Sequence, residues 1–413
     1  MQTILLIGTL DTKGDEYAYA AELIRERGGK VLVMNVGVFD PPPSKPGADP
    51  EPLVADIVPT VVAREGHSSI ADLRAANDRG RAMEVMSAGA AEITAQLYRD
   101  GKFDGVLGLG GGGGTTVISA AMRELPVGVP KVLVSTMASG NTSPYVDVKD
   151  ITMMYPVVDI AGLNPLSRRI LSNAVGAVLG MTALPVDRDE REELRPVIAA
   201  TMFGVTTPCV TAARKRLEAV GYDVLVFHAT GSGGRAMEGL IDDGYIDAVL
   251  DVTTTEWCDE VVGGTLSAGP TRLSAAARRG IPQVVSVGAL DMVNFGTFDS
   301  VPSLFGDRLF YRHNASVTLM RTTTEECREI GMRIALQLSK SHGPVTLMLP
   351  LRGVSMIDAP GQPFHDPEAN AALFESLREH CSSHVHIREL DMHINDPAFA
   401  DAMVDELLSM LVG

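Results

Sequence analysis

Two stretches of this chain share one pattern: residues 3–37 read TILLIGTLDTKGDEYAYAAELIRERGGKVLVMNVG, and residues 196–230 read PVIAATMFGVTTPCVTAARKRLEAVGYDVLVFHAT. The two stretches align without a gap. Each runs from an apolar strand through a polar loop into an amphipathic helix ending at Gly28 or Gly221, and then into a second apolar strand. This order predicts parallel strands joined by a crossover helix.

The similarity continues along both halves. RDGKFDGVLGLGG at 99–111 matches DDGYIDAVLDVTT at 242–254, and GVPKVLVS at 128–135 matches GIPQVVSV at 280–287. A chance likeness of two strand–helix–strand segments is the alternative explanation. We predict an α/β chain of two Rossmann-like three-layer domains with mainly parallel sheets, related by an internal repeat.

The predicted domains cover residues 1–185 and 195–413, on either side of a charged linker at 187–193. Two domains suit a chain of 413 residues, which is more than one hydrophobic core usually organises. Between Asp40 and about Ser87 the first copy carries an insertion that the second lacks, beginning with a proline-rich turn at 41–47. Such an insertion serves as a lid, as a dimer contact or only as a surface loop.

Composition limits the partners. The chain has 52 acidic and 35 basic residues and a net charge of -17, with no basic stripe, so nucleic acid is not an expected partner. A nucleotide remains possible because backbone N–H groups can hold it locally. The N-terminal apolar run Ile4–Ile7 is too short for a membrane span and follows no basic segment. We expect a cytoplasmic protein whose four separated cysteines are free thiols: Cys209, Cys258, Cys327 and Cys381.

The loops that follow the strands are the candidate ligand sites, because ligands of doubly wound sheets bind beyond the carboxyl ends of the strands. In the first such loop Thr12 and Asp15 have capping-box spacing, so we predict that Thr12 caps a helix and that Lys13 places a positive charge near a bound anion. The alternative is a capped helix start with solvated charges. Candidate nucleotide contacts here are Thr9, Asp11, Thr12 and Lys13.

A run of glycines follows the third strand of the first half. Five consecutive glycines are costly to order, so we expect them to bring backbone amides close to phosphate oxygens, with two threonine hydroxyls beside them. The candidate contacts are Gly110, Gly111, Gly112, Gly113, Gly114, Thr115 and Thr116. No GxxxxGK[ST] sequence occurs, and the acid that a NAD-binding fold carries after its second strand is missing, since Asn35 stands there.

A hydroxyl-rich loop follows the fourth strand. Its residues suit a ribose or phosphate, or else a hydrogen-bonded turn: Ser135, Thr136, Ser139, Gly140 and Asn141. Asp147, Asp150 and Asp159 follow and would meet Mg²⁺ only through a nucleotide, so we predict no metal site of the protein's own.

The second half carries different loops, which indicate a second ligand. A glycine-rich loop and nearby polar groups suit a carboxylate or phosphate, and the candidate contacts are Gly231, Ser232, Gly233, Gly234, Arg235, Thr253, Thr254 and Arg352. His228, Glu256, His365 and Asp366 are the candidate acid–base groups. The alternative for His228 is a structural role. No HExxH or GxSxG sequence occurs.

Several motifs together resemble those of the Tm-one-like ATP-binding family, which includes the N-terminal inhibitory region of a tomato mosaic virus resistance protein. They are GTLDTKGDE, GLGGGGGTT, HATGSGGRAME, RHNASVTLMRTTTEE and PLRGVSMIDAPGQPFHDPEAN, and they span almost the whole chain. The resemblance implies ATP in the N-terminal domain, contacted by the loops around Thr9–Lys13, Gly110–Thr116 and Ser135–Asn141, and it implies a homodimer.

Two functions therefore remain open from the sequence. The first is an enzyme that uses ATP or acts on a small acidic metabolite at a cleft between the halves. The second is a nucleotide-responsive regulatory module without chemistry of its own, in which ATP orders the insertion at 40–87. A dehydrogenase is a third reading, against which the missing acid at Asn35 counts.

Overall fold

The computed structural model describes residues 1–40, 51–184 and 195–411 of the chain. It divides into two compact units, Met1–Arg191 and Glu192–Gly413, which are described separately here. The proline-rich turn at 41–47 and the charged linker at 187–193 lie outside the described residues.

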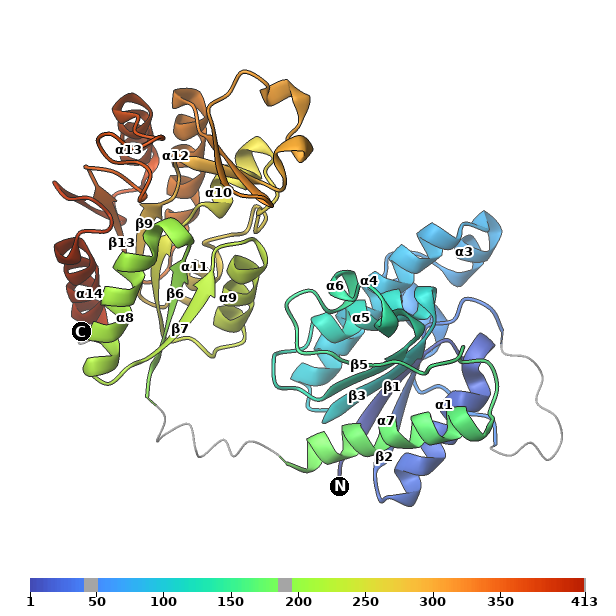
Figure 1. The fold of residues 1–413 in the computed structure, drawn as a ribbon. Coiled ribbons are helices and arrows are strands. Elements are labelled where there is room, and N and C mark those ends of the chain that lie inside the picture. The colour runs from blue at the N-terminus through green and yellow to red at the C-terminus, as the bar shows by residue number, and fades with distance from the viewer. Residues whose placement is uncertain (41–50, 185–194, 412–413) are drawn as a thin grey trace. The chain divides into compact units, whose positions relative to one another are not determined.

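The first unit is a parallel five-stranded sheet of order β2-β1-β3-β4-β5 (Figure 1). Its elements are β1 (Thr3–Gly8), α1 (Leu10–Glu26), β2 (Lys30–Asn35), α2 (Pro59–Glu65), α3 (Ile70–Ala76), α4 (Arg79–Arg99), β3 (Gly105–Gly110), α5 (Gly112–Arg123), β4 (Lys131–Ser135), α6 (Ser143–Val146), β5 (Thr152–Met154) and α7 (Pro165–Ala183). The insertion thus supplies α2 and α3, and α4 is the crossover helix before β3.

Alternation along β1 explains the three layers. Leu5 and Ile7 belong to a core shared with α4 and α5, whereas Ile4 and Leu6 belong to one shared with α1 and α7. Because both faces of the strand are covered, it reads as a continuous apolar run. Figure 1 shows α1 and α7 on one side of this sheet and α5 on the other.

The second unit repeats this order. Its parallel sheet runs β14-β13-β9-β8-β6-β7, so β7-β6-β8-β9-β13 corresponds to β2-β1-β3-β4-β5. The elements are β6 (Val197–Met202), α8 (Thr207–Ala219), β7 (Asp223–His228), α9 (Ser232–Asp242), β8 (Ala248–Thr253), α10 (Glu256–Val262), α11 (Ala275–Arg279), β9 (Gln283–Gly288), β13 (Val345–Pro350), α13 (Pro367–His380), β14 (His386–Leu390) and α14 (Pro397–Leu411). The predicted α/β class and internal repeat are confirmed.

One element of the second unit was not predicted. Between β9 and β13 the chain forms a three-stranded antiparallel sheet of order β10-β12-β11, followed by a helix. These elements are β10 (Met292–Phe295), β11 (Phe310–Asn314), β12 (Val317–Arg321) and α12 (Thr324–Leu338). The strands are four or five residues long, too short to give a clear alternation in the sequence.

Candidate functional site

The glycine run after β3 forms an open helix start. Gly111 is the N-cap of α5, and the Thr115 N–H donates to the Gly111 carbonyl at 2.8 Å. The N–H groups of Gly112, Gly113 and Gly114 precede the first intrahelical bond and therefore have no acceptor within the helix. Gly112 is exposed and Gly113 and Gly114 are partly exposed, so a ligand can reach these amides. Together with the helix dipole they favour an anion.

An arginine from the neighbouring helix lies over this start. Arg79 is the first residue of α4, and its Nη2 atom lies 3.2 Å from the point where a Cβ would stand on Gly113. No described residue forms an ion pair with Arg79. A guanidinium beside exposed N–H groups suits a phosphate oxygen, which accepts from both. Sequence reasoning missed Arg79, because only the packing of α4 on α5 brings it to the glycine run.

The loop after β1 differs in part from its prediction. Thr12 is not a helix cap, because α1 already begins at Leu10 and Thr9 is its N-cap residue. The Thr9 and Thr12 hydroxyls instead hydrogen-bond to each other at 2.8 Å. Lys13 donates through Nζ to the Ile160 carbonyl, so its charge is tied to the loop before α7. Asp11 accepts from the Phe39 N–H at 3.1 Å, while its buried Oδ1 has no partner among the described residues.

Two of the predicted hydroxyl contacts are internal. Thr115 Oγ1 and Ser135 Oγ are fully buried and lie 2.6 Å apart, which ties the α5 start to the end of β4. Ser135 also accepts from the Met137 N–H at 3.0 Å. Thr116 donates back to the Gly112 carbonyl at 3.0 Å. These hydroxyls shape the loop.

The remaining predicted contacts after β4 lie at the surface. Thr136 is half-buried, and its Oγ1 lies 3.9 Å from where a Cβ would stand on Gly111. Ser139 and Gly140 are exposed, and Asn141 Oδ1 accepts from the N–H and hydroxyl of Ser143. Thr136 is thus the hydroxyl of this loop placed beside the glycine run.

A buried tyrosine holds the strand ends in place beneath this site. Tyr17 Oη donates to the Ile7 carbonyl and accepts from the Leu109 N–H at 2.6 Å. A Cβ on Gly8 would stand 1.9 Å from the ring, so the ring fits only against glycine. Burial raises the pKa of Tyr17. The tyrosine therefore stays a neutral donor that fixes β1 against β3.

In the second unit the predicted glycine-rich loop is already occupied. Glu256 Oε1 accepts from the N–H groups of Gly231 at 2.7 Å and Gly234 at 3.0 Å, at the start of α9. Glu256 is 1% exposed. The loop does suit a carboxylate, as predicted, but the carboxylate belongs to the chain itself. The structure therefore gives Glu256 the place assigned to a ligand.

A buried arginine holds this carboxylate. Arg272 Nε donates to Glu256 at 2.7 Å and Nη2 donates to Asp251 at 2.8 Å, while Glu238 lies 3.4 Å from Nη1. Burial opposes the charge of Arg272, but the three carboxylates outweigh it and raise its pKa. Asp251 also accepts from Thr201 at 2.6 Å. One guanidinium thus faces three carboxylates, and backbone N–H groups donate to Glu256 and Glu238 as well, as a buried charged network requires.

The other candidates around this loop have varied surroundings. Thr253 and Thr254 are fully buried; their hydroxyls bond to Thr201 and Thr206, and to the Ser286 carbonyl. Arg235 donates to the Ser267 carbonyl at 3.2 Å. The exposed His228 ring lies 5.8 Å from that of Phe203. Ser232 is exposed, and a Cβ on Gly233 would stand 1.8 Å from the His228 carbonyl. The structure thus separates these residues into buried supports and surface groups.

Two of the three remaining candidates line a cavity of about 440 Å³ beyond the ends of β13 and β14. Arg352 and His365 line it, whereas Asp366 caps α13 by accepting from the N–H groups of Glu368 and Ala369. Arg352 is exposed and pairs with Asp391. Asp366, predicted as an acid–base group, thus already has a structural use as a helix cap.

Two buried carboxyl groups lie behind the wall of this cavity. Asp291 accepts from Ser355 at 2.7 Å, and Asp358 accepts from the Val354 N–H at 2.9 Å and from Asn370 at 2.7 Å. Burial, and for Asp291 the charge of Asp358, raises the pKa of both, to about 7 for Asp291. The Oδ1 atom of each has no hydrogen-bond partner among the described residues. The stretch DAPGQPFHD contains Asp358, but nothing in the sequence indicates that Asp358 lies near Asp291.

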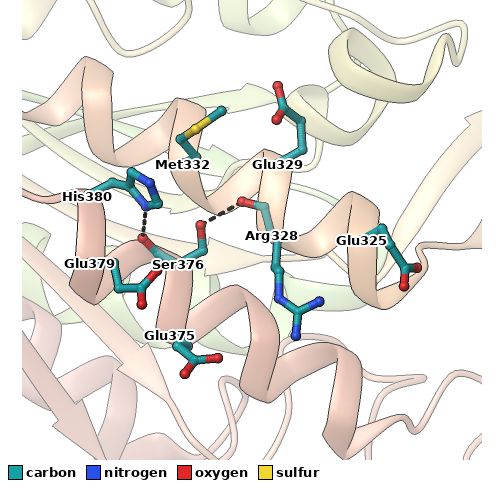
Figure 2. Close-up of a pocket in the computed structure, with 8 residues that line it drawn as sticks. All are labelled: Glu325, Arg328, Glu329, Met332, Glu375, Ser376, Glu379 and His380. Carbon is teal, nitrogen blue, oxygen red and sulfur yellow. Dashed lines mark hydrogen bonds between the residues drawn. The ribbon is translucent and has the colours of Figure 1, made fainter.

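A second cavity, of about 210 Å³, lies on the flank of the unit between α12 and α13 (Figure 2). Its lining includes four glutamates, Glu325, Glu329, Glu375 and Glu379. Ser376 donates to the Arg328 carbonyl, and His380 contacts the Ser376 carbonyl, so these polar groups serve the helices themselves (Figure 2). Four carboxylates would repel a phosphate or an organic acid, so this cavity is not our candidate site.

Metal and membrane sites were sought within residues 1–40, 51–184 and 195–411. In that part of the chain, no three His, Cys, Asp or Glu side chains come together as a set able to hold a metal ion. None of its helices combines the length and the apolar character needed to cross a bilayer. The four cysteines are free, and three of them are buried.

These observations define the class of protein: two repeated parallel α/β units, the first with an open amide-lined helix start after β3 and the second with the helix start after β7 filled by its own carboxylate. The chain belongs to the Uncharacterised protein family (UPF0261), whose N-terminal domain matches residues 2–186 and whose C-terminal domain matches residues 195–411.

Relatives match along almost the whole chain. A UPF0261 protein of Clostridium tetani is 52% identical over 99% of this chain and 98% of its own length. The ToMV resistance protein Tm-1(GCR237) of Solanum lycopersicum is 40% identical over 98% of this chain, which corresponds to 55% of that protein. The predicted family resemblance is confirmed. Among solved structures, UDP-N-acetylglucosamine 2-epimerase from Rickettsia bellii matches 69% of this chain and 78% of its own at 11% identity and a TM-score of 0.24. A likeness at that TM-score carries no argument about function.

Proposed function

We propose that the N-terminal unit binds ATP, with the phosphate groups at the start of α5 and any Mg²⁺ carried by the nucleotide. The observation that carries this proposal is the set of N–H groups at Gly112–Gly114, exposed or partly exposed and without an acceptor in the helix, beside the Arg79 guanidinium. The family resemblance supports a nucleotide triphosphate over a free anion. Thr136 supplies a hydroxyl at the edge of the same site.

Other residues of the unit support the site without contacting the ligand. Thr115 and Ser135 brace the start of α5 from below, and Tyr17 fixes the strand ends. Because these groups are hydrogen-bonded before any ligand arrives, little reorganisation opposes binding. Thr9 and Thr12 lie after β1, the strand next to β3, and we assign them to the far side of the nucleotide.

Calorimetric titration of the full chain with ATP, ADP and NAD tests the proposal, together with Gly112→Val. A side chain at Gly112 would have room, since the nearest atom, Met137 Sδ, is 3.9 Å from its Cβ position. We therefore expect a nearly unchanged Tm without ligand, but an ATP affinity lower by about tenfold or more, because the side chain would cover the amides. Gly180→Val is the matched control, at an exposed helical glycine of α7 with nothing within 4 Å.

Two outcomes would overturn the nucleotide site. One is tighter binding of NAD than of ATP, and the other is equal ATP affinity in Gly112→Val and Gly180→Val. Phosphate release during the same titrations separates an ATP-using enzyme from a regulatory module, since the module binds without turnover. Light scattering with and without ATP tests the homodimer that we propose for the module.

A further inference from the structure

The cavity in the second unit has the size and lining of a small-molecule site. Its volume of about 440 Å³ falls within the range of about 300–1,000 Å³ that such sites occupy. One face of α13 forms an apolar wall through Pro367, Ala371 and Phe374. It opens beyond the carboxyl ends of β13 and β14, where ligands of parallel sheets bind.

Two histidines line the cavity, and only one has a nitrogen available. His393 Nε2 donates to the Ser355 carbonyl at 2.9 Å, and its Nδ1 accepts from the Asn395 N–H at 3.1 Å. Both nitrogens of His393 are therefore used. His365 Nδ1 faces Asp358 Oδ1 at 3.9 Å, which leaves its Nε2 for the cavity.

Asp358 lies beside the ring of His365. Asp358 is fully buried, its Oδ2 already accepts two hydrogen bonds, and its Oδ1 has no hydrogen-bond partner among the described residues. The distance of 3.9 Å from Oδ1 to His365 Nδ1 is too long for a hydrogen bond, but it places the carboxyl group next to that edge of the ring. When Nε2 carries the ring hydrogen, His365 can donate it to a negatively charged oxygen in the cavity.

The rim carries one arginine, Arg352, and one carboxylate, Asp396. Arg352 lines the cavity and uses Nε and Nη2 to hold Asp391, so its Nη1 group remains for a ligand. A negatively charged oxygen can thus accept from His365 and from Arg352, while apolar atoms contact Phe374 and its neighbours. Because Asn370 donates to Asp358 and accepts from Arg321 at 3.0 Å, the wall is held rigid.

We propose that this cavity binds a small organic carboxylate with an apolar body, that His365 and Arg352 hold its carboxylate, and that Asp358 is the positioning residue for His365. The site does not depend on nucleotide binding by the first unit. No residue of α5 or of its neighbouring loops takes part in it.

Three probes with one apolar body test the proposal on the full chain: 3-phenylpropanoate, 3-phenylpropan-1-ol and 3-phenylpropan-1-amine. By calorimetry we expect the carboxylate to bind about tenfold tighter than the alcohol, with the amine weakest. His365→Leu should remove the difference between carboxylate and alcohol. His384→Leu, at an exposed histidine bonded to Ser382, is the control and should keep it.

Asp358→Asn separates positioning from a merely structural role. The new amide can donate to His365 Nδ1, which leaves hydrogen on Nε2, so the order of the three probes should persist, and ¹⁵N spectra should show a protonated Nε2. Equal affinity for all three probes, no binding of the carboxylate at 10 mM, or an unchanged preference in His365→Leu would each overturn the proposal. ATP titrations on the same samples report on the first unit separately.

Discussion

The two units of this chain carry opposite residues at one equivalent position, in the helix that follows β3 or β8. In the alignment that pairs residues 99–111 with 242–254, Gly113 stands opposite Glu256. In the second unit Glu256 reaches across to the amides at the start of α9. In the first unit that position has no side chain, and Arg79 of α4 reaches across to it from the other direction.

The difference lies in which unit supplies its own anion. The second unit fills its amides with a carboxylate and balances it with Arg272 inside the core. The first unit leaves its amides partly exposed and keeps a cation beside them. The duplicated fold thus has a self-filled anion site at the start of α9, after β7, and an open helix start at α5, after β3, which supports our proposal that ATP binds the first unit.

The largest expected effect comes from removing the cation of the self-filled site. Arg272→Met would leave Glu256, Asp251 and Glu238 buried without their counter-ion, which costs about 3–5 kcal/mol. Urea unfolding should show this loss. Arg278→Met, on the surface of α11 where Arg278 pairs with Asp242, should change stability by less than about 0.5 kcal/mol. Equal stability of the two variants would mean that the buried network does not hold Glu256.

The next effect comes from making the first unit resemble the second. Gly113→Glu would place a carboxylate beside Arg79, as Glu256 lies beside Arg272, and only the flexible end of Arg79 would need to move. The new carboxylate would compete with phosphate for the amides, so we expect ATP affinity to fall about 100-fold, or about 2.7 kcal/mol. Gly113→Gln introduces a side chain of the same size without the charge, so its ATP affinity should fall by less. Wild-type ATP affinity in Gly113→Glu would contradict the parallel between the sites.

A third difference is that the helix after β8 carries a buried group that can titrate, whereas the equivalent position in the helix after β3 does not. Asp259 of α10 stands opposite Thr116 of α5, and burial raises its pKa from 3.8 to about 7, although Asn294 lowers it in part. Between these values the folded state holds a proton that the unfolded state has released. The stabilisation is therefore present below the ordinary pKa and is lost as pH rises through about 7.

From this shift the free energy of unfolding should fall by about 2 kcal/mol between pH 5.5 and 7.5 through Asp259 alone. Asp259→Asn cannot titrate, so the variant should lose that part of the pH dependence. Asn294 has a buried Oδ1 without a partner and can turn to accept from the new amide. Urea unfolding at the two pH values measures the difference. An unchanged slope in Asp259→Asn would assign the proton to another group.

The repeated architecture could be predicted from the sequence because strand, helix and turn signals are local. The gap-free match of 3–37 with 196–230 gave the order of β1, α1 and β2 and of their counterparts β6, α8 and β7. Gly28 and Gly221 have positive φ after the helices that they were expected to end. The glycine run was likewise recognised as a loop that opens a helix.

The partners of the site could not be predicted, because they are set by packing between distant segments. Arg79 lies 34 positions before Gly113 and meets it only through the contact of α4 with α5. Arg272 lies 16 positions after Glu256 and meets it only in the fold, so the sequence alone predicts a catalytic role for Glu256. The sequence predicts Thr115 and Ser135 as ligand contacts because hydroxyls in loops serve structure and binding alike.

The smallest expected effect tests the cation of the open site. Arg79→Gln keeps the length and polarity of the side chain but removes the charge, so ATP affinity should fall about tenfold, or about 1.4 kcal/mol. Because Arg79 is exposed, salt should screen its contribution, and raising the salt concentration should weaken ATP binding more in the wild type than in the variant. Arg81→Gln is the control, since two residues along a helix turn the side chain to the opposite face. If the amides alone held the nucleotide, ATP binding would show the same salt dependence in the wild type and in Arg79→Gln. The comparison with Arg272 would then rest on the glycines and not on the arginine.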